Sequence, residues 1–204
     1  MNQQRLFSFG PAESSGRQEN YSGVPGLTFW PGFLSENEQY NLLREIDSRE
    51  WQTDLRRRVQ HYGYKYDYKA RKIDPSMYVG PLPPFAVEVG HRLFEQCLTA
   101  ELPDQVIINE YLPGQGITPH IDCEPCFKDF IATISLGSEC TMDLTNIESS
   151  ETQHVRLPVG SCLVFSGDAR FIWKHGIKAR KTDKGIRRGR RVSMTFRTVI
   201  KSVE

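Results

Sequence analysis

The chain has 204 residues, of which 38% are hydrophobic and 25% are charged, and its formal net charge is +1. At roughly 100–200 residues per domain this length predicts one domain, and the composition excludes wholesale disorder and fibrous repeats. No apolar run approaches the roughly 18 residues of a membrane helix, and the N-terminus lacks the apolar core of a secretory signal. We therefore expect a monomer that is cytoplasmic or nuclear and not secreted.

The small net charge hides two strongly basic segments. Residues 56–72 carry a net charge of +6 and residues 174–197 a net charge of +9, so the rest of the chain carries −14. Localised positive charge on an acidic body is typical of proteins that bind nucleic acid, although two solvated loops would give the same pattern.

Two helices are predicted in the first half of the chain. Residues 1–22 are polar and predict a flexible tail, followed by a single domain over residues 23–200 and a short tail at 201–204. A first helix begins at Ser35, where Glu38 completes a capping box. Its apolar stripe comprises Leu42, Leu43 and Ile46, with Trp51 closing it. A second helix opens near Pro84. Its apolar positions, four residues apart, are Phe85, Val89, Leu93 and Cys97.

Beyond residue 103 the pattern changes to short strands. Several segments there are rich in β-branched or aromatic residues and are bounded by Gly, Pro or Asn. They are residues 106–111, 130–136, 140–144, 162–166 and 192–200. Earlier in the chain, the alternation of residues 62–68 favours a hairpin. Helices followed by many short strands predict a mostly β fold with flanking helices, a β-sandwich or jelly roll.

The five cysteines are an odd number in a chain without a secretory signal, which argues against a disulfide framework. Cys123 and Cys126 have the spacing of metal ligands, but no second pair follows at zinc-finger distance. We expect ordinary reduced cysteines.

His120, Asp122 and His175 form a candidate metal site. Residues two apart on a strand project to the same side, so His120 and Asp122 can share one metal. A later strand can bring His175, which lies 53 residues beyond Asp122, to the third position. Two histidines and one carboxylate suit non-haem Fe(II), which must also hold a cosubstrate and O2, although the same ligands can hold catalytic zinc.

Arg191 and Arg197 favour iron over zinc. They lie six residues apart in a β-like segment and so share one face. A guanidinium group binds a carboxylate bidentately, so two on one face can grip both ends of a small dicarboxylate. Arginines on a solvated strand are the structural alternative.

These motifs resemble the AlkB family of Fe(II)/2-oxoglutarate dioxygenases over about residues 24–200. The resemblance is most specific in NEYLPGQGITPHID, ISLGSECTMDL, WKHGI and RRVSMTFR. It implies a double-stranded β-helix core with a helical buttress, and Fe(II) bound by His120, Asp122 and His175. The residues that it implies for 2-oxoglutarate are Asn109, Tyr111, Arg191, Ser193 and Arg197. Some members carry Asn at the position of Ser193. The shorter serine side chain would weaken that contact to 2-oxoglutarate or recruit a water, but it should not abolish binding.

The resemblance also makes residues 56–72 a nucleotide-recognition lid. Charges interleaved with tyrosines suit a segment that holds phosphate while stacking a base. Tyr68 resembles the aromatic residue that stacks on the flipped base, and Tyr66 its neighbour nearer the cosubstrate. Glu124, two residues past Asp122, is expected on the metal-facing side, where an acid can accept a hydrogen bond from adenine or cytosine or attract an N-methylated base. The basic residues expected to contact the substrate are Arg56, Arg57 and Arg58.

The implied activity is oxidative dealkylation of N-methyl or etheno adducts in DNA or RNA. With Fe(II) as the cofactor, 2-oxoglutarate and O2 would be consumed, and succinate, CO2 and an aldehyde would be formed. One alternative is hydroxylation of a modified wobble uridine in tRNA, because the segments HYGYKYDY and SLGSE resemble the enzymes that carry it out. Another is demethylation or hydroxylation of a protein. Wobble-uridine enzymes are typically fused to domains that do not fit in 204 residues, and Glu124 departs from their pattern, so dealkylation is favoured. The complete ligand and arginine sets disfavour a non-enzymatic nucleic-acid binder.

Overall fold

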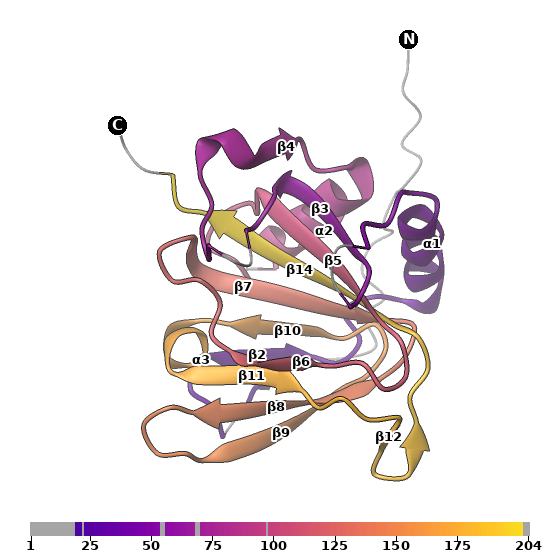
Figure 1. The fold of residues 1–204 in the computed structure, drawn as a ribbon, viewed down its shortest axis with the longest axis vertical. Coiled ribbons are helices and arrows are strands. Elements are labelled where there is room, and N and C mark those ends of the chain that lie inside the picture. Colours follow the sequence, from indigo (N-terminus) through magenta and orange to yellow (C-terminus); the bar gives the residue numbers. More distant parts are fainter. Residues whose placement is uncertain (1–18, 22, 54–55, 68–69, 97, 202–204) are drawn as a thin grey trace.

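The computed structural model describes residues 19–21, 23–53, 56–67, 70–96 and 98–201 (Figure 1). The elements in chain order are β1 (Glu19–Asn20), β2 (Leu27–Trp30), α1 (Glu36–Asp47), β3 (Val59–Tyr64), the 3-10 helix η1 (Pro75–Met77), β4 (Tyr78–Gly80), α2 (Pro84–Glu95), β5 (Gln105–Tyr111), β6 (Ile117–His120), β7 (Phe127–Leu136), β8 (Cys140–Asn146), β9 (Thr152–Leu157), β10 (Cys162–Phe165), α3 (Gly167–Phe171), β11 (Trp173–Ile177), β12 (Thr182–Asp183), β13 (Ile186–Arg187) and β14 (Arg191–Val199).

Two antiparallel sheets form the body of the protein. The larger has eight strands in the order β1-β2-β10-β7-β14-β5-β3-β4, and the smaller has four in the order β6-β11-β8-β9. The strands β12 and β13 form a separate two-stranded hairpin at the periphery (Figure 1). Strands distant in sequence alternate within each sheet, as in a jelly roll. The predicted mostly β fold with flanking helices is confirmed.

Both predicted helices pack on the larger sheet. Helix α1 begins with the expected capping box, in which the Ser35 amide donates to Glu38 Oε2 at 2.8 Å and the Ser35 hydroxyl accepts from the Glu38 amide. Leu42 and Ile46 of α1 are fully buried. Helix α2 begins at Pro84 and buries the predicted stripe up to Leu93, whereas Cys97 lies outside the described residues. The two helices therefore cover one face of the sheet, and the other face packs against the smaller sheet.

Strand alternation divides most of the described apolar residues between two cores. On β7, Ala132 and Ile134 pack with the helices, while Ile131 faces the smaller sheet. The second core lies between the sheets and includes Phe165 of β10 and Leu144 of β8. The candidate cosubstrate residues lie on that same inner face of the larger sheet, on β5 and β14. They are Asn109, Tyr111, Arg191, Ser193 and Arg197.

The predicted hairpin and tail differ in detail from the structure. Strand β3 ends at Tyr64 and pairs with β5 on one side and β4 on the other, so the hairpin partner lies further along the chain than expected. Within the predicted tail, Glu19–Asn20 form β1, and most of its other residues lie outside the described part. None of the described helices is long and apolar enough to cross a membrane.

Cys123 and Cys126 form a disulfide, so the expectation of reduced cysteines is wrong for this pair. The cause is a tight turn, in which the Cys126 amide donates to the Cys123 carbonyl oxygen at 3.2 Å. The turn brings the two Cα atoms to 5.2 Å, within the range that a disulfide spans. Cys140 and Cys162 are free and buried.

Candidate metal centre and cosubstrate cavity

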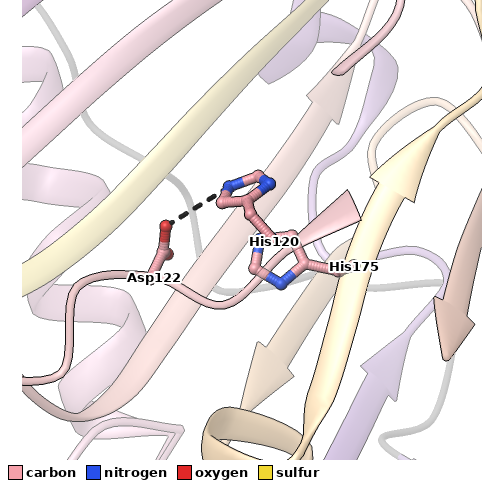
Figure 2. A group of neighbouring side chains, drawn as sticks. All are labelled: His120, Asp122 and His175. Atoms are coloured by element: carbon pink, nitrogen blue, oxygen red, sulfur yellow. Dashed lines mark ion pairs between the residues drawn. The ribbon is translucent and has the colours of Figure 1, made fainter. Parts of the chain in front are cut away.

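The smaller sheet brings the two candidate histidine ligands together. Strands β6 and β11 are antiparallel neighbours in which His120 and His175 stand directly opposite each other. Their ring centroids are 4.4 Å apart. Asp122 joins them from the loop that follows β6, with its Oδ1 atom 3.6 Å from His120 Nε2 (Figure 2). One donor atom from each residue lies within 4.8 Å of the others, close enough for one ion.

The protonation states of these residues fit metal binding. Burial alone would raise the pKa of Asp122, but the positive charge of the neighbouring Arg197 outweighs it and holds that pKa well below its usual range. Burial lowers the pKa of His175 to about 3. An ionised carboxylate and a neutral imidazole ring are the forms that ligate metals.

The tautomer of His120 also suits a metal ligand. Its Nδ1 atom lies 2.8 Å from the carbonyl oxygen of Thr118. Since a carbonyl only accepts, Nδ1 carries the proton, and the lone pair of Nε2 is left for an ion.

Two buried arginines hold the loop that carries Asp122. Arg197 donates to both carboxylate oxygens of Asp122, at 3.1 and 3.3 Å. Arg170 of α3 is 2% exposed and donates to the backbone carbonyl of Asp122 at 2.9 Å and to that of Cys123 at 3.3 Å. Sequence reasoning missed Arg170, because nothing in its local sequence indicates which distant carbonyls it reaches.

The candidate cosubstrate residues lie on the inner face of the larger sheet. In the β5–β14 register, Asn109 is opposite Ser193, and Tyr111 is opposite Arg191. Residues two apart on each strand share this face, so Arg197 joins them. All five line one cavity of about 1290 Å³ together with the three candidate metal ligands.

Arg191 provides an independent test of whether a dicarboxylate fits. The side chain is buried and its Nη2 atom donates to the Ser135 hydroxyl at 2.8 Å, but its Nε atom has no hydrogen-bond partner among the described residues. The guanidinium carbon lies 5.5 Å from the Tyr111 ring centroid. Burial raises the pKa of Tyr111, so its phenol stays protonated and can donate. A buried cation with an unused donor beside a phenol fits a carboxylate ligand.

The position of Ser193 bears on its departure from the family pattern. Its hydroxyl lies 2.9 Å from the hydroxyl of Thr133, on the neighbouring strand β7. The side chain is buried but lines the cavity. Ser193 can therefore offer one hydroxyl to a cosubstrate while Thr133 fixes its orientation.

The three predicted lid arginines point in different directions. Arg56 is exposed and lines the cavity. Arg57 also lines it, but donates inward to Asn109. Arg58 instead pairs with Glu110 at 2.6 Å and stacks over Trp51, and it is not among the described cavity-lining residues. Arg58 is exposed too, but of these two exposed arginines only Arg56 lies at the cavity.

Of the other predicted substrate residues, only Tyr66 is found at the cavity. It is half-buried, lines the cavity and packs against Phe127 with ring centroids 5.8 Å apart. Tyr68 lies outside the described residues. Glu124 is exposed, in a turn, and is not among the described lining residues. Strand β6 ends at His120, so the alternation that was expected to carry Glu124 to the metal side does not extend that far.

Comparison with known proteins agrees with this geometry. Residues 26–197 match the family described as the 2OG-Fe(II) oxygenase superfamily. The chain therefore belongs to this superfamily. Membership implies Fe(II), 2-oxoglutarate and O2, which confirms the cofactor and cosubstrates predicted from the sequence.

Several relatives are AlkB proteins, as the resemblance implied. The chain is 36% identical to the alkylated DNA repair protein ALKBH8 homolog of Arabidopsis thaliana, over 86% of this chain and 59% of that protein. It is 37% identical to the tRNA (carboxymethyluridine(34)-5-O)-methyltransferase alkbh8 of Xenopus tropicalis, over 78% of this chain and 26% of that protein. It is 31% identical to a DNA N6-methyl adenine demethylase of Caenorhabditis elegans, over 87% of this chain and 61% of that protein. The chain thus spans less than two thirds of each of these relatives.

A solved structure shares the fold of this oxygenase. OsALKBH1 superimposes with a TM-score of 0.67 at 18% identity, covering 89% of this chain and 100% of that one. At this identity the likeness concerns the fold alone, and it agrees with the jelly-roll core.

Proposed function

We propose that this oxygenase oxidatively dealkylates N-alkylated nucleobases in DNA or RNA. Succinate, CO2 and an aldehyde would be the products beside the restored base. The observation that carries the proposal is that one cavity is lined both by His120, Asp122 and His175 and by Arg191 and the proposed lid residue Arg56. Two relatives support an alkylated base as substrate, since their names denote an alkylated-DNA repair protein and a DNA N6-methyl adenine demethylase.

In this proposal the two sheets have separate roles. His120, Asp122 and His175 hold Fe(II), which when bound supplies oxidation of a C–H bond with O2 and 2-oxoglutarate. Arg191 binds the distal carboxylate of 2-oxoglutarate, with the Tyr111 phenol as a second donor. The unused Nε donor of Arg191 supports this role. The rest of the cosubstrate would be contacted by Asn109, Ser193 and Arg197.

The lid would hold the substrate base above the cosubstrate. An enzyme that acts on a base must take it out of the stack, and aromatic side chains replace the lost stacking. We assign this role to Tyr66 and Tyr68, with Arg56 on a flanking phosphate. Glu124 is retained as a proposed contact to the exocyclic amine or cationic ring, although its exposure demands that the lid or substrate bring the base to it.

A second candidate is hydroxylation of a modified wobble uridine in tRNA. The 37% identical Xenopus relative is named for an enzyme of that nucleotide, which supports it. The charge of the cavity supports it too, because six basic residues and two acidic residues of the described chain line the cavity. They are Arg56, Arg57, Arg71, Lys178, Arg191 and Arg197 against Asp122 and Asp143. Excess positive charge disfavours a cationic base and favours a neutral or anionic one.

One experiment separates the two candidates. The protein is incubated with Fe(II), ascorbate, 2-oxoglutarate and oligonucleotides carrying N1-methyladenine, N3-methylcytosine, ethenoadenine or N6-methyladenine, beside a tRNA stem-loop with a modified wobble uridine. Mass spectrometry reads the mass change of each base, and Asp122→Ala serves as the inactive control. Loss of the alkyl group supports dealkylation. Gain of one oxygen on the stem-loop alone would replace it with the second candidate.

A further inference from the structure

Arg57 connects the lid segment to the cosubstrate wall. Its Nε atom donates to Asn109 Oδ1 at 2.8 Å. Its guanidinium carbon lies 5.9 Å from the centroid of the Tyr111 ring, which also lies beside Arg191. The contact arises from strand register, because β3 begins two residues after Arg57 and pairs Val59 with Asn109.

This contact fixes which end of the Asn109 amide faces the cavity. A guanidinium group has only donors, so the amide atom that meets Arg57 must be the oxygen. The other amide atom, Nδ2, carries two N–H donors and is directed away from Arg57. Among the described residues, the contact from Arg57 is the only side-chain hydrogen bond of Asn109, and Asn109 lines the cavity. The amide therefore presents donors, which attract a carboxylate, instead of an oxygen, which would repel it.

We propose that Arg57 is a positioning residue for 2-oxoglutarate, which acts by orienting the Asn109 amide so that its N–H groups face a cosubstrate oxygen. The inference rests on the cosubstrate role proposed for Asn109. Arg57 belongs to the basic lid segment, where a contact with nucleic-acid phosphate was expected. The inference gives it a function in cosubstrate binding instead.

Titration of 2-oxoglutarate into the protein loaded with Mn(II) tests the inference without any nucleic acid. Arg57→Met should weaken 2-oxoglutarate binding roughly 5- to 30-fold, the effect of losing one well-placed hydrogen bond. In turnover, KM for 2-oxoglutarate should rise by a similar factor while kcat at saturating 2-oxoglutarate changes little. Arg57→Lys keeps a charged donor and should recover most of the affinity. Arg156→Met is the matched control, since that exposed arginine pairs with Glu139 outside the described cavity lining.

Asn109→Asp distinguishes amide orientation from a general structural effect. It is isosteric and keeps an acceptor for Arg57, but it removes both N–H donors. It should bind 2-oxoglutarate at least as weakly as Asn109→Ala. The double variant Arg57→Met/Asn109→Ala should be no weaker than Asn109→Ala alone, because Arg57 acts through Asn109.

The inference would be overturned if either Arg57→Met or Asn109→Asp bound 2-oxoglutarate with wild-type affinity. It would also be overturned if the two losses of affinity added in the double variant. Weakened binding of an unmodified oligonucleotide by Arg57→Met, with normal 2-oxoglutarate affinity, would instead return Arg57 to the phosphate-contact role. Failure of the wild type to oxidise any base tested would overturn only the proposed substrate, since the titration measures the cosubstrate directly.

Discussion

At the scale of single residues, Arg191 combines deep burial with an unused donor. Arg191→Ala should raise the 2-oxoglutarate concentration needed for half-maximal turnover by roughly 10- to 150-fold. This corresponds to about 1.5–3 kcal/mol for a charge-assisted hydrogen bond. Succinate formation measured against 2-oxoglutarate concentration checks the effect, and an unchanged titration would remove Arg191 from the cosubstrate site.

Asp122 is the residue on which two functions converge. It is one of three candidate iron ligands, and it is also the carboxylate that pairs with buried Arg197. Asp122→Ala should therefore abolish stoichiometric metal binding and also destabilise the fold, by up to about 3–5 kcal/mol, because buried Arg197 would keep its hydrogen bond to the neutral amide of Gln105 but lose its carboxylate partner. Metal titration and urea unfolding measure the two effects separately. Tight binding of one metal ion by the variant would contradict the ligand assignment.

At the scale of elements, the proposed lid segment holds its arginines in different surroundings. Arg56 is exposed at the cavity, whereas Arg58 pairs with buried Glu110. Arg56→Ala should reduce the slope of log affinity against log salt by about 1 for an unmodified oligonucleotide, the effect of losing one phosphate contact. Arg58→Ala should leave that slope unchanged and lower Tm instead, because Glu110 loses one of its partners. Equal slopes for wild type and Arg56→Ala would show that Arg56 makes no phosphate contact and is simply solvated.

The elements predicted correctly from the sequence are those with local signals. Helix α1 has its cap and stripe within twelve residues, and β14 is a long run of β-formers. Strand β6 was expected only through the spacing of His120 and Asp122 and was given no bounds, because its four residues, ITPH, include a proline. Strand β9 was missed because its sequence, TQHVRL, is mostly polar.

The same distinction explains which site residues were found. Arg191 and Arg197 stand six apart on one strand, so their spacing alone predicts a shared face. Asp122 was expected on a strand with His120, but it lies in the loop after β6, where Arg197 and Arg170 hold it beside the histidines. The inward direction of Arg57 depends on how β3 is registered against β5, which involves residues about 50 positions away. Glu124 was placed by extending a strand that ends at His120. Spacing predicts a face only while the strand continues.

At the scale of the whole molecule, much of the second basic segment is neutralised internally. Two carboxylates outside the segment pair with it, Asp143 with Lys178 and Asp122 with Arg197. Arg190 bridges Glu110 of β5 and Asp47 of α1. The net charge of +9 read from the sequence therefore overstates the positive charge that this segment presents to a partner.

The buried site makes the stability of the metal-free protein depend on pH. Burial depresses the pKa of His175 from 6.5 to about 3, so between these values the unfolded chain binds the proton and the folded chain does not. Stability is therefore complete above about pH 6.5 and falls as pH drops, by about 1.4 kcal/mol per pH unit. Urea unfolding in the presence of a chelator should show a loss of roughly 2 kcal/mol between pH 6.5 and pH 5.

His175→Gln supplies the comparison for that measurement. Glutamine does not titrate, so the variant should lose most of the pH dependence in this window, whatever its absolute stability. The carboxylates with depressed pKa values, including Asp122 and Asp183, add their own dependence only below about pH 4.5, since their unfolded forms titrate there. An equally steep dependence in His175→Gln would assign the effect to other groups.

The position of β3 and β4 at the margin of the eight-stranded sheet has a consequence for how this enzyme can diverge. An outermost strand has one unpaired side, so the segments attached to it can lengthen, shorten or change composition without re-pairing the strands inside. Selection can thus exchange the segment proposed to contact the substrate and keep the candidate metal centre unchanged. Arg57 limits that freedom, because it lies in the exchangeable segment yet contacts Asn109 of β5. A transplanted segment that lacks an arginine at this place would bring a new substrate preference at the expense of cosubstrate affinity.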